Sequence, residues 1–271
     1  MYILNEGTKS LTEISETTFS ENGLKERYDL QEWIDNNPEI ISKELGKDEE
    51  LLIIQKEFSN FDKTKERLDL LALDKKGNLV IIENKLDDSG KDVTWQALKY
   101  ASYCSTLTKS DIISIYQKYL DKNNSEEKAE EKISDYLGGE DINVNERGSQ
   151  RIILIAREFK PEVTSTVLWL RSYEIDIQCI KFTPYEFQDK LIIDVDKIIP
   201  LPETEEFTIK LAIKDAEDKN ISIVKNIKGN IYFDYWSRLL ESKGNLSLYN
   251  KTTASREHYI QTSAGISGVY Y

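Results

Sequence analysis

Short apolar blocks, separated by charged and turn-forming residues, run through positions 24–200 and predict alternating helices and strands. The first block, 24–36, places Leu30, Trp33 and Ile34 on one side of a helical wheel, which is typical of an amphipathic helix. Pro38 follows and ends that helix.

Three strand-like blocks come next. The segments LLIIQKEF (51–58), LDLLALD (68–74) and NLVIIENK (78–85) are rich in branched apolar residues. The sequence DKKGN at 74–78 predicts a tight turn, so the second and third strands are expected to form a hairpin. Residues 92–120 predict two helices with a break near 108–110.

The second half of this region repeats the alternation. The apolar run RIILIARE (151–158) predicts a buried strand, and Pro161 then opens a helix at a position where proline is tolerated. Two further strands are expected at 175–185 and 191–199. This order of elements predicts an α/β (α+β) fold with a mixed central sheet flanked by helices.

The same pattern suggests domain boundaries. We expect an N-terminal arm at 1–23, one domain at 24–202, a linker at 203–229 and a C-terminal extension at 230–271, for which a shortened second domain stays open. Within the domain, the insert 121–146 carries nine acidic residues against three lysines and is interpreted as a solvated helix and loop.

Composition narrows the chemistry. The chain has 271 residues and a net charge of −13, which disfavours a broad basic surface for nucleic acid. The region 56–109 is nearly neutral, with ten basic and nine acidic residues, so a local basic groove remains open. No GxxxxGK[ST] loop is present, so no nucleoside triphosphate site is expected.

Histidine and cysteine are scarce. His258 is the single histidine, which disfavours histidine-rich metal sites. Cys104 and Cys179 are interpreted as reduced, buried thiols of a cytoplasmic protein. No signal peptide and no apolar run of membrane-spanning length are seen, so no membrane partner is expected.

Three charged residues interrupt the predicted hairpin. If its loop is centred on Lys76, Asp69 lies directly opposite Glu83, with Cβ atoms about 5 Å apart. Lys85 stands two residues beyond Glu83 and projects from the same face. Two carboxylates and an ammonium group are therefore expected at one end of the hairpin.

Such a group admits two interpretations. Two carboxylates and water suit Mg²⁺, which activates water and neutralises a scissile phosphate. Lys85 would then hold the attacking water or stabilise the charge that develops on phosphorus-bound oxygens. The alternative is a structural ion pair across the hairpin, and the pattern alone leaves both open.

The residues around the hairpin resemble the PD-(D/E)XK nuclease superfamily, in the RecB-like and archaeal-type mismatch endonuclease branch. The resemblance covers about residues 20–200 and rests on three segments: LKERYDLQEWIDNNPEII, RLDLLALDKKGNLVIIENK and WQALKYASY. It implies a divalent metal bound by Asp69, Glu83 and the backbone carbonyl of Asn84. Leu68 stands where these nucleases usually have proline.

The tail from residue 232 is similar to the beginning of a module of unknown function that follows such nuclease cores in bacterial proteins. His258 and Trp236 belong to this tail and are interpreted as packing or recognition residues.

Further site residues are proposed on helical and strand geometry. At about 100° per residue, Glu26 falls on the inward face of the first helix, as an auxiliary metal or water ligand or as the partner of a basic residue. Glu57 is interpreted as an edge charge.

Gln96 and Tyr100 share a helix face, like the Q-x-x-x-Y motif of the RecB-like nucleases, and are expected to orient Lys85 or contact a phosphate. The alternative is a hydrogen bond between the two side chains on a packed helix. Arg67 is a candidate phosphate contact or an ion-pair partner of Glu66 or Asp69, and Lys56 is a candidate contact to the nucleic-acid backbone.

These observations predict an Mg²⁺- or Mn²⁺-dependent DNA endonuclease acting in restriction, repair or defence. The alternative is a DNA-binding or protein-interaction module that does not cleave, and an RNA-directed enzyme is a weaker one. A homodimer stays open, since double-strand cleavage by such folds usually needs two active sites.

Overall fold

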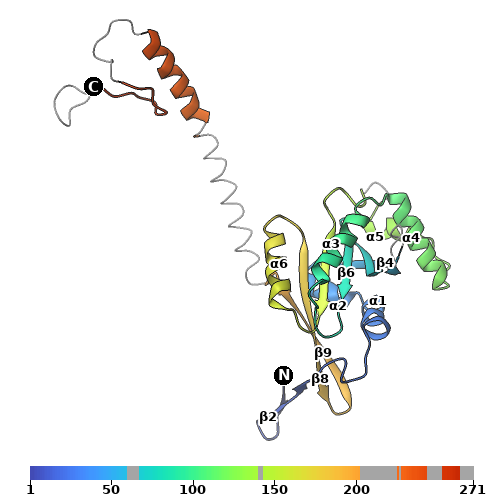
Figure 1. Cartoon of the computed structure of the whole chain (residues 1–271). Coiled ribbons are helices and arrows are strands. Elements are labelled where there is room, and N and C mark those ends of the chain that lie inside the picture. Colours follow the sequence, from blue (N-terminus) through green and yellow to red (C-terminus); the bar gives the residue numbers. More distant parts are fainter. Residues whose placement is uncertain (60–66, 140–142, 202–224, 226, 243–251, 263–271) are drawn as a thin grey trace. The chain divides into compact units, whose positions relative to one another are not determined.

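The computed structural model describes residues 1–59, 67–139, 143–201, 225, 227–242 and 252–262. The chain divides into two compact units, Met1–Pro202 and Glu203–Tyr271. The first unit carries the central sheet and its helices (Figure 1).

The central sheet is mixed. Its strands lie in the order β3 (Ser15–Glu16), β8 (Ile177–Phe187), β7 (Arg151–Ala156), β6 (Leu79–Asn84), β5 (Leu68–Asp74) and β4 (Leu51–Phe58), and β9 (Lys190–Ile199) pairs with β8. Strands β6, β7 and β8 are parallel, and the other pairs are antiparallel. The predicted mixed sheet is confirmed.

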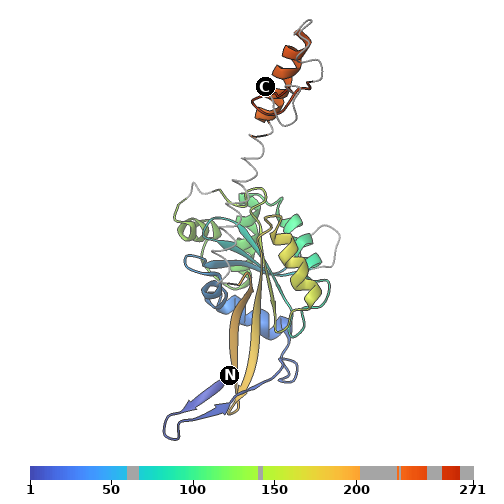
Figure 2. The same ribbon diagram turned by 90° about the vertical axis from the view of Figure 1, so that its left-hand side faces the viewer.

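Helices cover both faces of this sheet (Figure 2). One face packs against η1 (Glu26–Leu30), α1 (Gln31–Asn36) and α2 (Glu39–Leu45). The other packs against α3 (Val93–Cys104), α4 (Lys109–Lys122), α5 (Ala129–Leu137) and α6 (Pro161–Arg171). From Leu70 to Leu73 on β5 the side chains alternate between the two cores, because successive residues of a strand point to opposite faces. Strands β5, β6 and β7 are therefore buried throughout.

Most predicted elements are confirmed, but α2 was not predicted, and two further segments differ. The segment 1–23, expected as an arm, forms the hairpin β1 (Tyr2–Asn5) and β2 (Ser10–Glu13), and β3 pairs with β8. The acidic insert is not wholly solvated, because Ala129, Ile133 and Leu137 of α5 are buried in the core beside α4. Its charges occupy the opposite, outward side of that helix.

The second unit contains a helix at 227–242, as the pattern from residue 232 predicted. The indole Nε1 of Trp236 donates to the carbonyl of Glu257 at 2.9 Å. Most of the expected linker at 203–229 lies outside the described residues. Among the described helices, none combines the length and apolarity that crossing a bilayer requires.

A buried ion cluster fixes the turn end of the β5–β6 hairpin. The Arg151 guanidinium contacts Asp74 at 2.9 Å, Asp176 at 2.8 Å and Glu49 at 2.5 Å. The Asp74 side chain is 2% exposed and also accepts the backbone N–H groups of the turn residues Lys76 and Asn78. Arg151 therefore ties β7 to the hairpin turn.

Replacing Arg151 with Met is expected to lower the free energy of unfolding by about 3 kcal/mol or more, because Asp74 is left as a buried charge without its cation. Urea unfolding followed by circular dichroism measures the change. The control is Arg147→Met at an exposed position, which should stay within about 0.5 kcal/mol of the wild type. Equal stabilities of the two variants would contradict a stabilising role for the cluster.

Candidate active site

The register of the hairpin brings the predicted carboxylates together. The pairs Leu70–Ile82 and Leu73–Leu79 are equidistant from Lys76, as predicted. Asp69 and Glu83 follow at the open end of the same register, where they are 8% and 3% exposed. The open end of this hairpin is therefore a nearly buried acidic site.

Lys85 and Glu26 join the two carboxylates. The Lys85 Nζ atom lies 3.0 Å from Glu83 Oε1 and 3.8 Å from Glu26 Oε1. The other Glu26 oxygen accepts the backbone N–H of Leu86 at 3.0 Å. Lys85 itself is fixed at the main chain, since its N–H donates to the Ile155 carbonyl at 2.8 Å.

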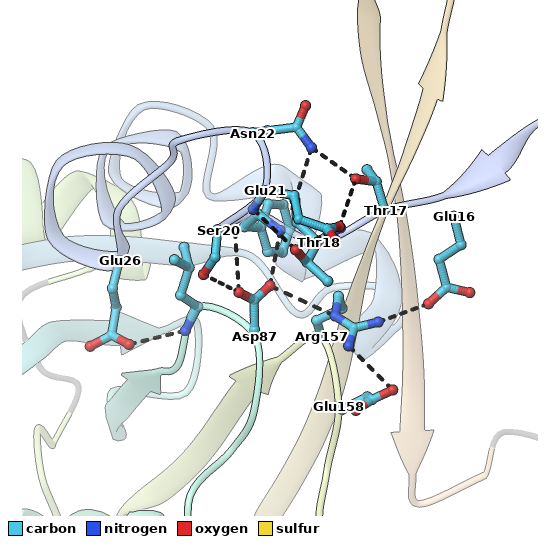
Figure 3. Close-up of polar contacts among 12 residues, drawn as sticks. Glu16, Thr17, Thr18, Ser20, Glu21, Asn22, Glu26, Asp87, Arg157 and Glu158 are labelled. Carbon is cyan, nitrogen blue, oxygen red and sulfur yellow. Dashed lines mark hydrogen bonds and ion pairs between the residues drawn. The ribbon is translucent and has the colours of Figure 1, made fainter.

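The position of Glu26 depends on the loop after β6. The Asp87 carboxylate in that loop accepts the backbone N–H groups of Phe19 at 2.9 Å and Ser20 at 3.2 Å, and also the Ser20 hydroxyl. Arg157 Nε lies 3.7 Å from Asp87 and ties the loop to β7 (Figure 3). These contacts hold the segment that leads into η1, and thereby Glu26, against the site.

Asp69 is held by two donors. Its Oδ2 accepts the backbone N–H of Asn84 at 2.7 Å, and its Oδ1 accepts Gln31 Nε2 at 2.7 Å. Gln31 is 1% exposed, and its own Oε1 is buried without a hydrogen-bond partner. Sequence reasoning missed Gln31, because it falls about 100° from Leu30 on a helical wheel, away from the inward-facing residues.

The site carries more acid than base. Burial and the nearby Glu83 raise the pKa of Asp69 to about 8. Burial also raises the pKa of Glu83. Burial opposes the charge of Lys85, but Glu83, Glu26 and Asp69 outweigh it and raise its pKa. Lys85 therefore stays an ammonium group, while the carboxylates resist ionising together.

These residues fit a hard divalent cation. The Glu83 Oε2 atom is buried without a hydrogen-bond partner, and a cation would supply one and relieve the repulsion between the carboxylates. In the described ranges, no three Asp, Glu, His or Cys side chains form a metal cluster by themselves. Backbone oxygen and water would therefore complete the coordination begun by Asp69 and Glu83.

Helix α3 contributes differently from expectation. The Gln96 Oε1 atom is buried without a hydrogen-bond partner. Tyr100 is only 3% exposed and packs in the core, so little of its side chain is open to solvent. Lys99, which the sequence did not single out, acts on Glu83 by lowering its pKa against the larger effect of burial. Lys99 directly precedes Tyr100 on α3, and this position was the signal that the sequence analysis missed.

The two predicted backbone contacts are both in ion pairs. Lys56 Nζ lies 2.7 Å from Glu32 and 3.1 Å from Asp35, so it fastens β4 to α1 instead of standing free for a phosphate. Arg67 lies 3.3 Å from Glu57, which is therefore more than an edge charge. Arg67 remains half-exposed.

No protein-family model and no curated protein matches the chain. Among solved structures, a repair endonuclease from Pyrococcus abyssi aligns with 58% of this chain and 47% of its own, at 16% identity and a TM-score of 0.28. An EndoMS–dsDNA complex aligns with 63% of this chain and 47% of its own, at 15% identity and a TM-score of 0.28. The chain thus spans about half the length of each, and a TM-score of this size does not establish a common fold.

The raised pKa of Asp69 has a consequence for stability. The folded state binds more protons than the unfolded state between about pH 4 and pH 8, so the free energy of unfolding should fall as the pH rises through that window. Asp69→Asn removes the charge, and Gln31 can turn its unpartnered Oε1 toward the new amide N–H.

We expect Asp69→Asn to flatten this fall and to be more stable than the wild type by more than about 1 kcal/mol near pH 8. Urea unfolding at a series of pH values, without divalent metal, tests it. Asp135→Asn, at an exposed position on α5, should keep the wild-type profile. Parallel profiles for wild type and Asp69→Asn would refute the electrostatic description of the site.

Proposed function

We propose that this chain is a metal-dependent nuclease that hydrolyses DNA phosphodiester bonds at Asp69, Glu83 and Lys85. The observation that carries the proposal is the meeting of two buried carboxylates and an ammonium group at the open end of one hairpin, with one Glu83 oxygen left unpartnered. The resemblance of the flanking segments to the PD-(D/E)XK nucleases supports the same assignment.

Asp69, Glu83 and the backbone carbonyl of Asn84 would hold Mg²⁺ or Mn²⁺. When bound, such an ion lowers the pKa of its water and neutralises charge on a phosphate. Gln31 and the Asn84 N–H each donate to one oxygen of Asp69, which fixes the orientation of its carboxylate.

Lys85 supplies the positive charge of the site. Its ammonium group is held by Glu83 and Glu26 and is kept protonated by them. An ammonium group in a nearly buried position stabilises negative charge that develops on the phosphate oxygens, and it can orient the attacking water by donating to it. Glu26 thus acts as a positioning residue for Lys85.

An internal cut in DNA is the expected outcome, and cleavage of both strands would take two copies of the site. Restriction, repair and defence all require this reaction.

The proposal predicts cleavage of labelled single-stranded, duplex or branched DNA in the presence of Mg²⁺ or Mn²⁺. Lys85→Ala and Asp69→Ala should each lower the rate by about 100-fold or more, because the first removes the positive charge beside the reacting phosphate and the second removes a carboxylate ligand of the metal ion. Glu130→Ala, an exposed change on α5, serves as the control. Binding of DNA by the wild type without any cleavage would instead favour a module that has kept the fold and lost the reaction.

Metal binding has its own readout. Mg²⁺ or Mn²⁺ at about 100 times its Kd should stabilise the wild type by about 2.7 kcal/mol, seen as a rise in Tm. Asp69→Ala should abolish this rise, because it removes one of the two carboxylate ligands, and Glu130→Ala should retain it. A rise of equal size in Asp69→Ala would place the metal elsewhere.

A further inference from the structure

Two arginines share one carboxylate beside the candidate active site. Arg27 Nη2 lies 3.1 Å from Glu57 Oε2, and Arg67 Nη1 lies 3.3 Å from the same oxygen. The side chains of Arg27 and Arg67 are 49% and 50% exposed, whereas that of Glu57 is 18% exposed. The carboxylate of the cluster is therefore mostly buried, whereas its two guanidinium groups are half-exposed to solvent.

The cluster lies next to the acidic site in the fold. Arg27 directly follows Glu26 on η1, and Arg67 stands two residues before Asp69. The register pairs that bracket Glu57, which are Lys56–Leu70 and Phe58–Leu68, set it level with Asp69 on the neighbouring strand. Because adjacent strands are about 4.8 Å apart, Glu57 lies beside Asp69, and the two arginines that contact Glu57 lie close to the site.

The backbone at Glu57 is adapted to this arrangement. Glu57 has φ = 53°, in the left-handed region that non-glycine residues seldom adopt, and the ladder between β4 and β5 shifts register after Ile53. Arg27 is also steadied by the ring of Tyr28, whose centroid is 5.9 Å from the guanidinium carbon. The contacts with Glu57 and with the Tyr28 ring restrict the Arg27 guanidinium before any ligand binds.

Charge and donor count distinguish this cluster from an ordinary ion pair. One carboxylate neutralises one arginine, so a net charge of about +1 remains in a half-exposed position. Each guanidinium has five N–H donors, and in the described part of the chain neither arginine has a second carboxylate partner. The unused donors suit the oxygens of a phosphate, which guanidinium groups bind in a bidentate manner.

We propose that Arg27 and Arg67, held in place by Glu57, bind a backbone phosphate of the substrate strand adjacent to the phosphate at Asp69 and Glu83. The inference rests on the proposed function, since it takes a nucleic-acid strand as the ligand. It assigns Arg27 and Arg67 to substrate binding and makes Glu57 a positioning residue. In a chain of net charge −13, such a local pair supplies the attraction that the overall surface lacks.

The first test compares Arg27→Ala and Arg67→Ala with Arg147→Ala. Arg147 is exposed and lies near the opposite, turn end of the hairpin, where the Asn145 N–H donates to Gly77. With the DNA that the wild type cuts, each of the first two variants should raise KM about tenfold and leave kcat within about threefold. Arg147→Ala should change neither by more than about twofold.

Binding without cleavage gives an independent readout. Fluorescence anisotropy of labelled single-stranded and duplex oligonucleotides in EDTA should show about tenfold weaker binding for both variants. The slope of log K against log salt should fall by about 0.7–0.9 for the lost phosphate contact. Replacing the bound phosphate with an uncharged methylphosphonate should weaken wild-type binding as much, and Arg27→Ala should lose nothing further on that oligonucleotide.

Variants of Glu57 distinguish a positioning role of this residue from a simple effect of its charge on DNA binding. Removing a negative charge from the surface favours DNA binding if Glu57 has no structural part in it. We expect the opposite for Glu57→Ala, a rise in KM at unchanged kcat, and recovery in Glu57→Gln, whose amide oxygen still accepts from both guanidiniums.

The failures are distinguishable. If the wild type cuts DNA and the Arg27 and Arg67 variants match Arg147→Ala in KM and anisotropy, the phosphate site is refuted. If the Arg27 and Arg67 variants have a lower Tm but an unchanged KM, the cluster is a structural ion pair, and the inference is refuted as well. If the wild type cuts no DNA, the proposed function fails, and the anisotropy and methylphosphonate measurements still decide whether the arginines bind phosphate.

Discussion

The register of one antiparallel hairpin controls the candidate site. Because β5 and β6 pair symmetrically about Lys76, the two strands end with Asp69 and Glu83 side by side. A slip of one residue would turn one of these carboxylates to the other face of the sheet and would move apolar side chains out of both cores. The burial of the hairpin on both faces therefore protects the geometry of the site.

Both ends of the hairpin contain buried carboxylates, but only those at the turn end have all their charge balanced by nearby partners. At the turn end, Asp74 is 2% exposed and is satisfied by Arg151 and by the N–H groups of the turn. At the open end, Asp69 and Glu83 are nearly as buried, but the ammonium group of Lys85 contacts only one Glu83 oxygen, and the other Glu83 oxygen lacks a hydrogen-bond partner. The first arrangement stabilises the fold, whereas the second retains unsatisfied charge that a cation would satisfy.

Local periodicity was enough to predict the strands, the hairpin register and the meeting of Asp69, Glu83, Lys85 and Glu26. It could not predict which polar neighbours support them. Gln31 reaches Asp69 only because α1 crosses that end of the sheet, and Asp87 anchors residues 19 and 20 through contacts that join segments far apart in the chain. Tyr100 lies on the helix face where it was expected, but it is buried in the core.

The arginines beside the site show why charge must be read locally. Glu57 looked like an edge residue because strand alternation does not reveal a positive φ, and that φ accompanies its contact with both Arg27 and Arg67. The acidic groups that would hold a cation lie on β5 and β6, and the basic groups that would hold a phosphate lie on η1 and directly before β5. A phosphodiester needs both at once, since its scissile phosphate must approach carboxylates that repel it. A cation held by the carboxylates and the guanidinium pair at Glu57 would offset that repulsion together, so the net charge of the chain says little about the field at this edge of the sheet.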